Sequence, residues 1–257
     1  MSDERRNRIF RYISEKGFAT ADELSERLGA SAVTIRRDFQ RLEDARLIER
    51  VHGGARLTES ATFDTPYSWR RSQQVEAKRA IGEYAVTLLR SGQALLLDAG
   101  STCVAAAAAI PDDLHIRVVT HSVEALHVLH DKPNVEVVAI GGQLNRDLGS
   151  CVGPITEELL GRFHADVSFL GAAHVNAEQG LVNDHLAEST IKRLIHQNAT
   201  ACYLLVDHTK LGARGFQTTV PMRDFQGTIV TDSGVDTAQE QRLRERGVRV
   251  VVAGRDG

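Results

Sequence analysis

The sequence predicts an α/β protein in two parts: a small N-terminal winged helix-turn-helix domain and a larger α/β domain built on a largely parallel sheet. Three observations predict this fold. Helical patterns with capping residues and a Gly-Gly hairpin fill residues 1–57. A segment with broken periodicity, which contains Pro66, follows over residues 58–74 and is expected to be a linker. Short apolar runs then alternate with helical stretches over residues 75–257.

The composition is that of an ordinary globular protein, with 257 residues of which 42% are hydrophobic and 25% are charged. No apolar run approaches the roughly 20 residues of a membrane span, and the first residues lack the apolar core of a signal peptide. The three cysteines, Cys103, Cys151 and Cys202, are far apart and have no metal-ligand spacing. We therefore expect a cytoplasmic protein with no disulfide framework, no metal and no cofactor.

Charge is distributed unevenly along the chain. Residues 1–56 hold 12 basic and 10 acidic residues, whereas the rest of the chain has a net charge of −5. A basic N-terminal part followed by an acidic remainder of the chain is typical of a protein that binds a polyanion through its basic part only. A net charge of +2 is modest, so this signal is weak by itself.

The first two predicted helices carry clear boundary signals. Residues 4–16 place Ile9 and Ile13 on one face, four positions apart. Thr20 is expected to begin the second helix, and Glu23 three residues later completes a capping box.

The third predicted helix has one apolar and one polar face. Ser31 is a natural N-cap, and Ile35, Phe39 and Leu42 recur at helical spacing and face the core. The opposite side and its flanks carry residues that can contact base edges or phosphates. These residues are Val33, Thr34, Arg36, Arg37 and Gln40.

Residues 47–57 predict two short strands around the Gly53-Gly54 turn. Such a wing can lie along a DNA backbone, with Arg50, His52 and Arg56 available for contacts. The expected DNA-binding residues are Ser31, Val33, Thr34, Arg36, Arg37, Gln40, His52, Gly53 and Gly54. The alternative is a three-helix protein-interaction module whose arginines are merely solvated.

In the larger domain, seven apolar runs predict the strands of a parallel sheet that is covered on both faces. The runs are 94–97, 116–119, 135–140, 166–170, 201–206, 228–230 and 248–252. Ligands bind such sheets outside the carboxyl ends of the strands. The segment Asp98-Ala99-Gly100-Ser101-Thr102 leaves one run and enters an Ala-rich helix, whose first amides can bind an anion.

Further polar residues follow other strands, namely Thr120, His121, Ser122, Gly141, Gly142 and Lys210. If they converge, they form an oxyanion pocket in which Lys210 pairs with a phosphate. The alternative is an ordinary set of strand-to-helix turns, in which Lys210 is a surface lysine.

The sequence resembles the DeoR family of bacterial transcription regulators. The likeness rests on Thr-Ile-Arg-Arg-Asp at 34–38, Arg-Val-His-Gly-Gly-Ala at 50–55, Asp-Ala-Gly-Ser-Thr at 98–102, and Val-Asp-His-Thr-Lys-Leu-Gly at 206–212. It also includes Glu188, which stands near Lys192-Arg193. His121 stands where members of the family commonly have Asn.

The resemblance implies a repressor of a sugar or sugar-derivative catabolic operon, released from its double-stranded DNA operator by a phosphorylated sugar or polyol. It also implies a homo-oligomer, and a sensor domain with the sugar-phosphate isomerase fold. The expected effector site then comprises Asp98, Gly100, Ser101, Thr102, Thr120, His121, Ser122, Gly141, Gly142, Glu188 and Lys210.

Two other functions remain possible at this stage. One is an isomerase-like enzyme with an appended DNA-binding domain. The resemblance implies that isomerases of this fold take a catalytic Asp from the loop that corresponds to residues 171–176. Here that loop holds no carboxylate for proton transfer, so we expect binding without turnover. The other is an architectural or activating DNA-binding protein whose pocket is vestigial.

Overall fold

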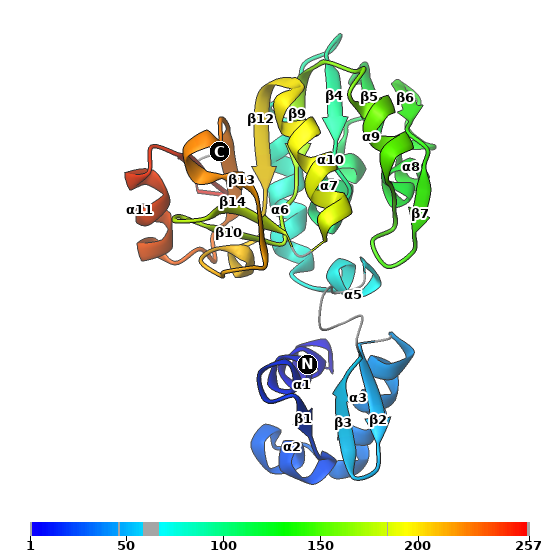
Figure 1. Cartoon of the computed structure of the whole chain (residues 1–257), viewed down its shortest axis with the longest axis vertical. Coiled ribbons are helices and arrows are strands. Elements are labelled where there is room, and N and C mark those ends of the chain that lie inside the picture. Colours follow the sequence, from blue (N-terminus) through cyan, green and yellow to red (C-terminus); the bar gives the residue numbers. More distant parts are fainter. Residues whose placement is uncertain (1, 46, 59–66, 184, 256–257) are drawn as a thin grey trace. The chain divides into compact units, whose positions relative to one another are not determined.

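The computed structural model describes residues 2–45, 47–58, 67–183 and 185–255 (Figure 1). The chain divides into two compact units, which we call the N-terminal unit (residues 1–73) and the C-terminal unit (residues 74–257).

The N-terminal unit combines helices with a three-stranded sheet in the order β1-β3-β2. Its elements are α1 (Ser2–Lys16), β1 (Phe18–Ala19), α2 (Ala21–Leu28), α3 (Ala32–Asp44), β2 (Ile48–Val51), β3 (Gly54–Leu57) and α5 (Tyr67–Ser72). The capping box is present, since Thr20 Oγ1 accepts from the Glu23 amide and Glu23 reaches back to the Thr20 amide. Ser31 caps α3 in the same way, through the Thr34 amide.

One apolar core holds this unit together, and the residues expected from helical spacing lie in it. Ile9, Ile13, Ile35 and Leu42 are fully buried, and Phe39 is almost so. The predicted winged helix-turn-helix fold is confirmed, because α1, α2, α3 and the β2–β3 hairpin pack around one apolar core.

The segment 58–74, expected as a linker, includes structure that the sequence analysis did not predict. Residues 59–66, with Pro66, lie outside the described residues. Residues 67–72 form helix α5, and the Trp69 ring packs against Phe10 of α1 at 5.6 Å between centroids. Buried aromatic area accounts for a short helix here that periodicity alone does not reveal.

The C-terminal unit is built on a seven-stranded, fully parallel sheet in the order β15-β14-β12-β9-β4-β5-β6 (Figure 1). Its strands are β4 (Ala94–Leu97), β5 (Ile116–Thr120), β6 (Val135–Ala139), β9 (Ala165–Leu170), β12 (Ala199–Leu205), β14 (Thr228–Asp232) and β15 (Arg249–Ala253). Each coincides with one of the seven apolar runs within one or two residues. The parallel sheet is therefore confirmed.

Helices cover both faces of this sheet. They are α6 (Val75–Val86), α7 (Ser101–Ala109), α8 (Val123–Leu129), α9 (Pro154–Leu160), α10 (Leu186–Gln197) and α11 (Thr237–Glu245). Because side chains alternate along a strand, Leu95 and Leu97 of β4 enter the core under α6, α7 and α8, whereas Leu96 enters the core under α9, α10 and α11. Burial on both sides explains why the strands read as unbroken apolar runs.

Two smaller β elements were not predicted. Strands β10 (His174–Asn176), β11 (Gly180–Asn183) and β13 (Gln217–Pro221) form an antiparallel sheet, and β7 (Gln143–Asn145) pairs with β8 (Ser150–Val152). Their short length and polar composition hide them from pattern analysis. Among the described residues, no helix is long and apolar enough to cross a membrane.

Candidate functional site

Helix α3 presents the polar face expected of a DNA-reading helix. Val33 is 58% exposed, and Arg36, Arg37 and Gln40 are exposed as well. Within the described part of the chain, neither the Arg36 nor the Arg37 guanidinium forms a hydrogen bond or an ion pair that would fix it against another residue. Ser31 Oγ is occupied in capping, and Thr34 lies half-buried beside it.

The same helix is held in place by a residue adjacent to its exposed arginines. Asp38 is 3% exposed and accepts a hydrogen bond from Arg5 Nε of α1 at 2.6 Å. This ion pair raises the pKa of Arg5 above its ordinary value, chiefly through the hydrogen bond to Asp38. The third member of the Arg-Arg-Asp sequence therefore fixes α3 against α1, while the two arginines face solvent.

In the wing, two of the three residues expected to be available for DNA are already paired. Arg50 forms an ion pair with Glu43 of α3 at 2.7 Å, and Arg56 pairs with Glu49 across the hairpin. The antiparallel register and the packing of β2 beside α3 bring each arginine to a carboxylate. Both ion pairs are exposed, so the availability of these arginines for DNA stays a prediction. His52 is exposed at the tip of the turn.

The two wing glycines do different things. Gly53 has φ of +88°, a turn conformation that favours glycine. A Cβ on Gly54 would lie 2.3 Å from the Ala19 carbonyl oxygen and 2.6 Å from the Phe18 ring. Gly54 is therefore required for β3 to approach β1.

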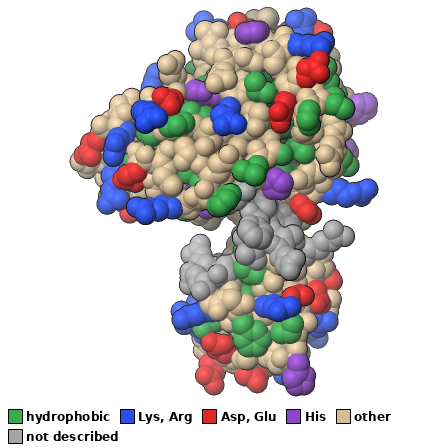
Figure 2. Space-filling model, in the orientation of Figure 1, with side chains coloured by type: hydrophobic (Ala, Val, Ile, Leu, Met, Phe, Trp, Pro, Cys, Tyr) green, Lys and Arg blue, Asp and Glu red, His purple; other side chains and the backbone are tan. Residues whose placement is uncertain are grey.

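Acidic and basic side chains are interspersed over the face of each unit that Figure 2 shows, with no large patch of a single sign. This agrees with the modest charge of residues 1–56. On this face the structure shows no broad positive field, so the contacts expected with DNA are those of the individual arginines of α3.

At the carboxyl edge of the large sheet, the register brings two predicted site segments together. Leu97 of β4 pairs with Thr120 of β5, so Asp98 and His121, the next residues, are neighbours. Gly141 and Gly142 follow β6, which is the next strand outward. Lys210 lies on the 3-10 helix η1 (His208–Lys210) after β12, and β9 separates β12 from β4.

A buried ionic cluster, defined here as Asp98, His121, Glu188 and Lys192, occupies this edge. Lys192 Nζ of α10 donates to Asp98 Oδ2 at 2.6 Å, and the Gly171 amide donates to the same oxygen at 2.8 Å. Lys192 and Asp98 are 4% and 1% exposed. Burial opposes the charge on Lys192, but attraction from Asp98 and Glu188 outweighs burial and raises its pKa above the ordinary value.

Lys192 was not among the predicted site residues, although the resemblance includes it as a residue near Glu188 in the sequence. The signal that could have found it is spacing, since residues four apart on a helix share a face. Glu188, 5% exposed, accepts a hydrogen bond from Asn183 Nδ2 at 3.2 Å. Glu188 belongs to the first turn of α10 and not to a strand end, which corrects the expectation that the site residues follow separate strands.

His121 is the least satisfied member of the cluster. Its side chain is 1% exposed, and neither ring nitrogen has a hydrogen-bond partner among the described residues. Its Nε2 lies 3.8 Å from Asp98 Oδ1, which is too far for a hydrogen bond. Burial lowers the pKa of His121 below the ordinary value, and attraction from Asp98 and Glu188 reverses only part of this effect.

Three other predicted site residues have structural roles within the protein. Two of them form hydrogen bonds through their side chains, and the third is a glycine that allows close packing. Thr120 Oγ1 donates to the Leu97 carbonyl at 2.8 Å, and Ser122 Oγ caps α8 through the Ala125 amide. A Cβ on Gly142 would lie 1.9 Å from Thr156 Oγ1, so glycine is needed there for close packing. These residues shape the edge of the sheet.

The amino end of α7 has the character expected of an anion site. Gly100 stands at the N-cap and supplies no side-chain hydrogen bond to the first amides of the nine-residue helix. Open space surrounds the position of a Gly100 Cβ, and Ser101 is half-exposed while Thr102 is 8% exposed. Helix amides without a cap, next to a buried polar cluster, can bind an anion.

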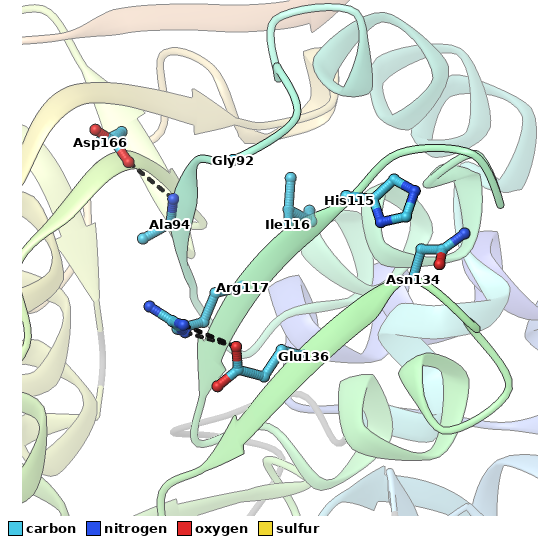
Figure 3. A pocket seen from close by; sticks show the side chains of 8 residues that line it. All are labelled: Gly92, Ala94, His115, Ile116, Arg117, Asn134, Glu136 and Asp166. Carbon is cyan, nitrogen blue, oxygen red and sulfur yellow. Dashed lines mark hydrogen bonds and ion pairs between the residues drawn. The ribbon is translucent and has the colours of Figure 1, made fainter.

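The structure also contains a pocket of about 490 Å³ at the opposite, amino edge of the sheet (Figure 3). Several of its polar groups are engaged within the protein. Arg117 donates to Glu136 at 2.8 and 3.0 Å, and Asp166 accepts from the Ala94 amide at 2.8 Å. We assign no ligand to this pocket.

Comparison with known proteins identifies both units. The model described as the DeoR-like helix-turn-helix domain matches residues 5–61, and the model described as the DeoR C-terminal sensor domain matches residues 73–233.

Similar proteins are transcriptional regulators. The HTH-type transcriptional regulator GlpR of Haloferax volcanii is 36% identical over 248 residues, 96% of each chain. GolR of Listeria innocua is 30% identical over 97% of this chain and 98% of its own. The glycerol-3-phosphate regulon repressor of Escherichia coli is 31% identical over 81% of this chain and 82% of its own.

Among solved structures, ribose 5-phosphate isomerase A of Methanocaldococcus jannaschii matches 54% of this chain and 55% of its own. Its sequence identity is 19% and its TM-score is 0.40. A likeness this low carries no conclusion about function.

Proposed function

Since this chain belongs to the DeoR family of transcriptional regulators, we propose that it represses a sugar or sugar-derivative catabolic operon and leaves its operator when a phosphorylated sugar or polyol binds. Family membership shows that the chain is a DNA-binding transcriptional regulator, and its named relatives are regulators and not enzymes. The effector, its site and the oligomeric state are the proposal.

The observation that carries the proposal is the uncapped amino end of α7 beside the buried ionic cluster. Ser101 and Thr102 follow Asp98 closely in the sequence, and Asp98 belongs to the buried ionic cluster. An anion bound to the amides of Ser101 and Thr102 would therefore lie near this cluster. Such a site suits a molecule with an anion at one end and hydroxyl groups at the other. One relative is named for a glycerol-3-phosphate regulon, which supports a phosphorylated polyol or sugar here.

To act as an inducer, the ligand must bind more tightly to the conformation that has low affinity for DNA. We propose that Asp98, Gly100, Ser101, Thr102, His121, Glu188 and Lys210 contribute to its site, with Lys210 reaching the phosphate. Thr120, Ser122, Gly141 and Gly142 complete the proposed surface.

Ser101→Ala and Lys210→Ala should each leave operator affinity unchanged while raising the inducer concentration needed for release by about tenfold or more. The reason is the loss of a hydrogen bond or an ionic contact to the phosphate. The measurement is a thermal-shift screen of phosphorylated sugars and polyols, followed by operator release with the compound that stabilises the protein. Ser233→Ala, an exposed serine after β14, is the matched control. Release at the wild-type concentration in both variants would place the pocket elsewhere.

We propose at least a dimer in solution, because one short helix and a wing cover too little DNA for operator-level specificity. The C-terminal unit is expected to supply the interface. Sedimentation velocity at micromolar concentration should show the dimer or a larger assembly. A monomer that binds operator DNA with full affinity would contradict this expectation.

A further inference from the structure

The buried ring of His121, at the edge of the proposed effector site, has no hydrogen bond to the residues that the structure describes. Both of its nitrogens lack a hydrogen-bond partner among the described residues, and the side chain is 1% exposed. Buried polar atoms in folded proteins are nearly always satisfied. At an exception beside a proposed ligand site, a bound molecule can supply the missing partner.

The surroundings define what that partner can be. Asp98 Oδ2 is already bonded to Lys192 Nζ at 2.6 Å, so the charge of Lys192 is balanced within the protein. The carboxylate of Glu188 also acts on the His121 ring. Cys103, at the start of α7, is buried beside Lys192. The carboxylates of Asp98 and Glu188 both act on the ring, so a further anion at this point would be repelled by two negative charges.

A neutral imidazole has one N–H donor and one nitrogen acceptor. An alcohol hydroxyl can accept from the ring N–H or donate to the other ring nitrogen, so it can pair with whichever nitrogen it meets without bringing charge to the carboxylates. A phosphate or carboxylate group only accepts, and it would face Asp98 and Glu188.

We propose that the unsatisfied ring of His121 marks a hydroxyl subsite and that His121 is the residue by which this protein selects a hydroxyl-bearing effector. This inference rests on the proposed function, since it assigns the chemistry of one end of that ligand. His121 is a specificity residue. The phosphate is held separately, at the amino end of α7.

The test uses two substitutions of nearly equal shape. His121→Asn keeps both a donor group and an acceptor, the amide NH2 and oxygen, whereas His121→Leu has neither. Binding to the full-length protein is measured by calorimetry with two probe pairs. The pairs are sn-glycerol 3-phosphate with n-propyl phosphate, and D-glucose 6-phosphate with 2-deoxy-D-glucose 6-phosphate. His127→Leu, on the exposed side of α8, is the control.

The wild-type protein and His121→Asn should prefer the hydroxyl-bearing member of at least one pair by about tenfold or more. His121→Leu should bind both members of that pair equally, and without ligand it should melt no lower than the wild-type protein, because no hydrogen bond within the protein is lost.

The inference alone is overturned if His121→Leu keeps the preference, since water or another residue then serves the ring. It is also overturned if the ligand-free His121→Leu protein is strongly destabilised while His121→Asn is not, since the histidine is then structural. If the wild-type protein binds no phosphorylated sugar or polyol, the proposed function fails, and the inference fails with it.

Discussion

Replacing Lys192 with methionine should destabilise the C-terminal unit by about 3–5 kcal/mol, because it leaves the Asp98 carboxylate buried without its cation. Asp98 is 1% exposed, and its Oδ2 lies 2.6 Å from Lys192 Nζ. The amides of Ala99 and Gly171 still donate to Asp98, which favours the lower end of this range. Urea unfolding followed by circular dichroism measures the loss.

Two further variants separate this effect from lost packing. Asp98→Asn combined with Lys192→Met removes both charges and should recover part of the stability. Arg162→Met breaks an exposed ion pair with Glu158 and should change the free energy of unfolding by less than about 0.5 kcal/mol. A Lys192→Met protein as stable as the wild type would show that the buried pair is not formed in solution.

Replacing Arg36 or Arg37 with alanine should weaken operator binding by roughly 1–3 kcal/mol if the side chain reads a base. If it contacts a phosphate instead, the loss should be similar for all DNA sequences, and the salt dependence of binding should flatten. Both residues are exposed on α3, whose opposite face is packed in the core through Ile35 and Phe39. Fluorescence anisotropy with DNA selected from a random pool by the wild-type protein measures the change.

Arg242→Ala is the matched control, since it removes the same charge from an exposed position on α11. It should bind the selected DNA as the wild-type protein does. If both α3 variants also bind unchanged, α3 is not the reading helix.

Periodicity and capping residues were sufficient to predict much of the fold. The core positions Ile35, Phe39 and Leu42 and the caps Thr20 and Ser31 follow from rules that act over a few residues. The strands of the large sheet were predictable because burial on both faces produces unbroken apolar runs. Helix α5 was not, because it depends on the packing of Trp69 against Phe10, far away in the sequence.

The candidate site was predictable at the level of strand ends and not at the level of individual contacts. The order of the sheet places Asp98 and His121 side by side, in agreement with the rule that ligand residues follow strands. Lys192 reaches the same point from the helix α10, 94 residues away from Asp98 in the sequence. Only tertiary packing determines such a pair. Likewise, the pairing of Arg50 with Glu43 depends on how the hairpin lies against α3.

The central claim is that this DNA-binding regulator dissociates from its operator when a phosphorylated sugar or polyol binds to the C-terminal unit. The most direct measurement titrates the wild-type protein onto its selected DNA, with and without the compound that stabilises it most in the thermal-shift screen. We expect tight binding without the compound and an affinity that falls about fivefold to 150-fold, or more, at saturation. The account is contradicted if the protein binds the selected DNA equally well at every concentration of every stabilising compound.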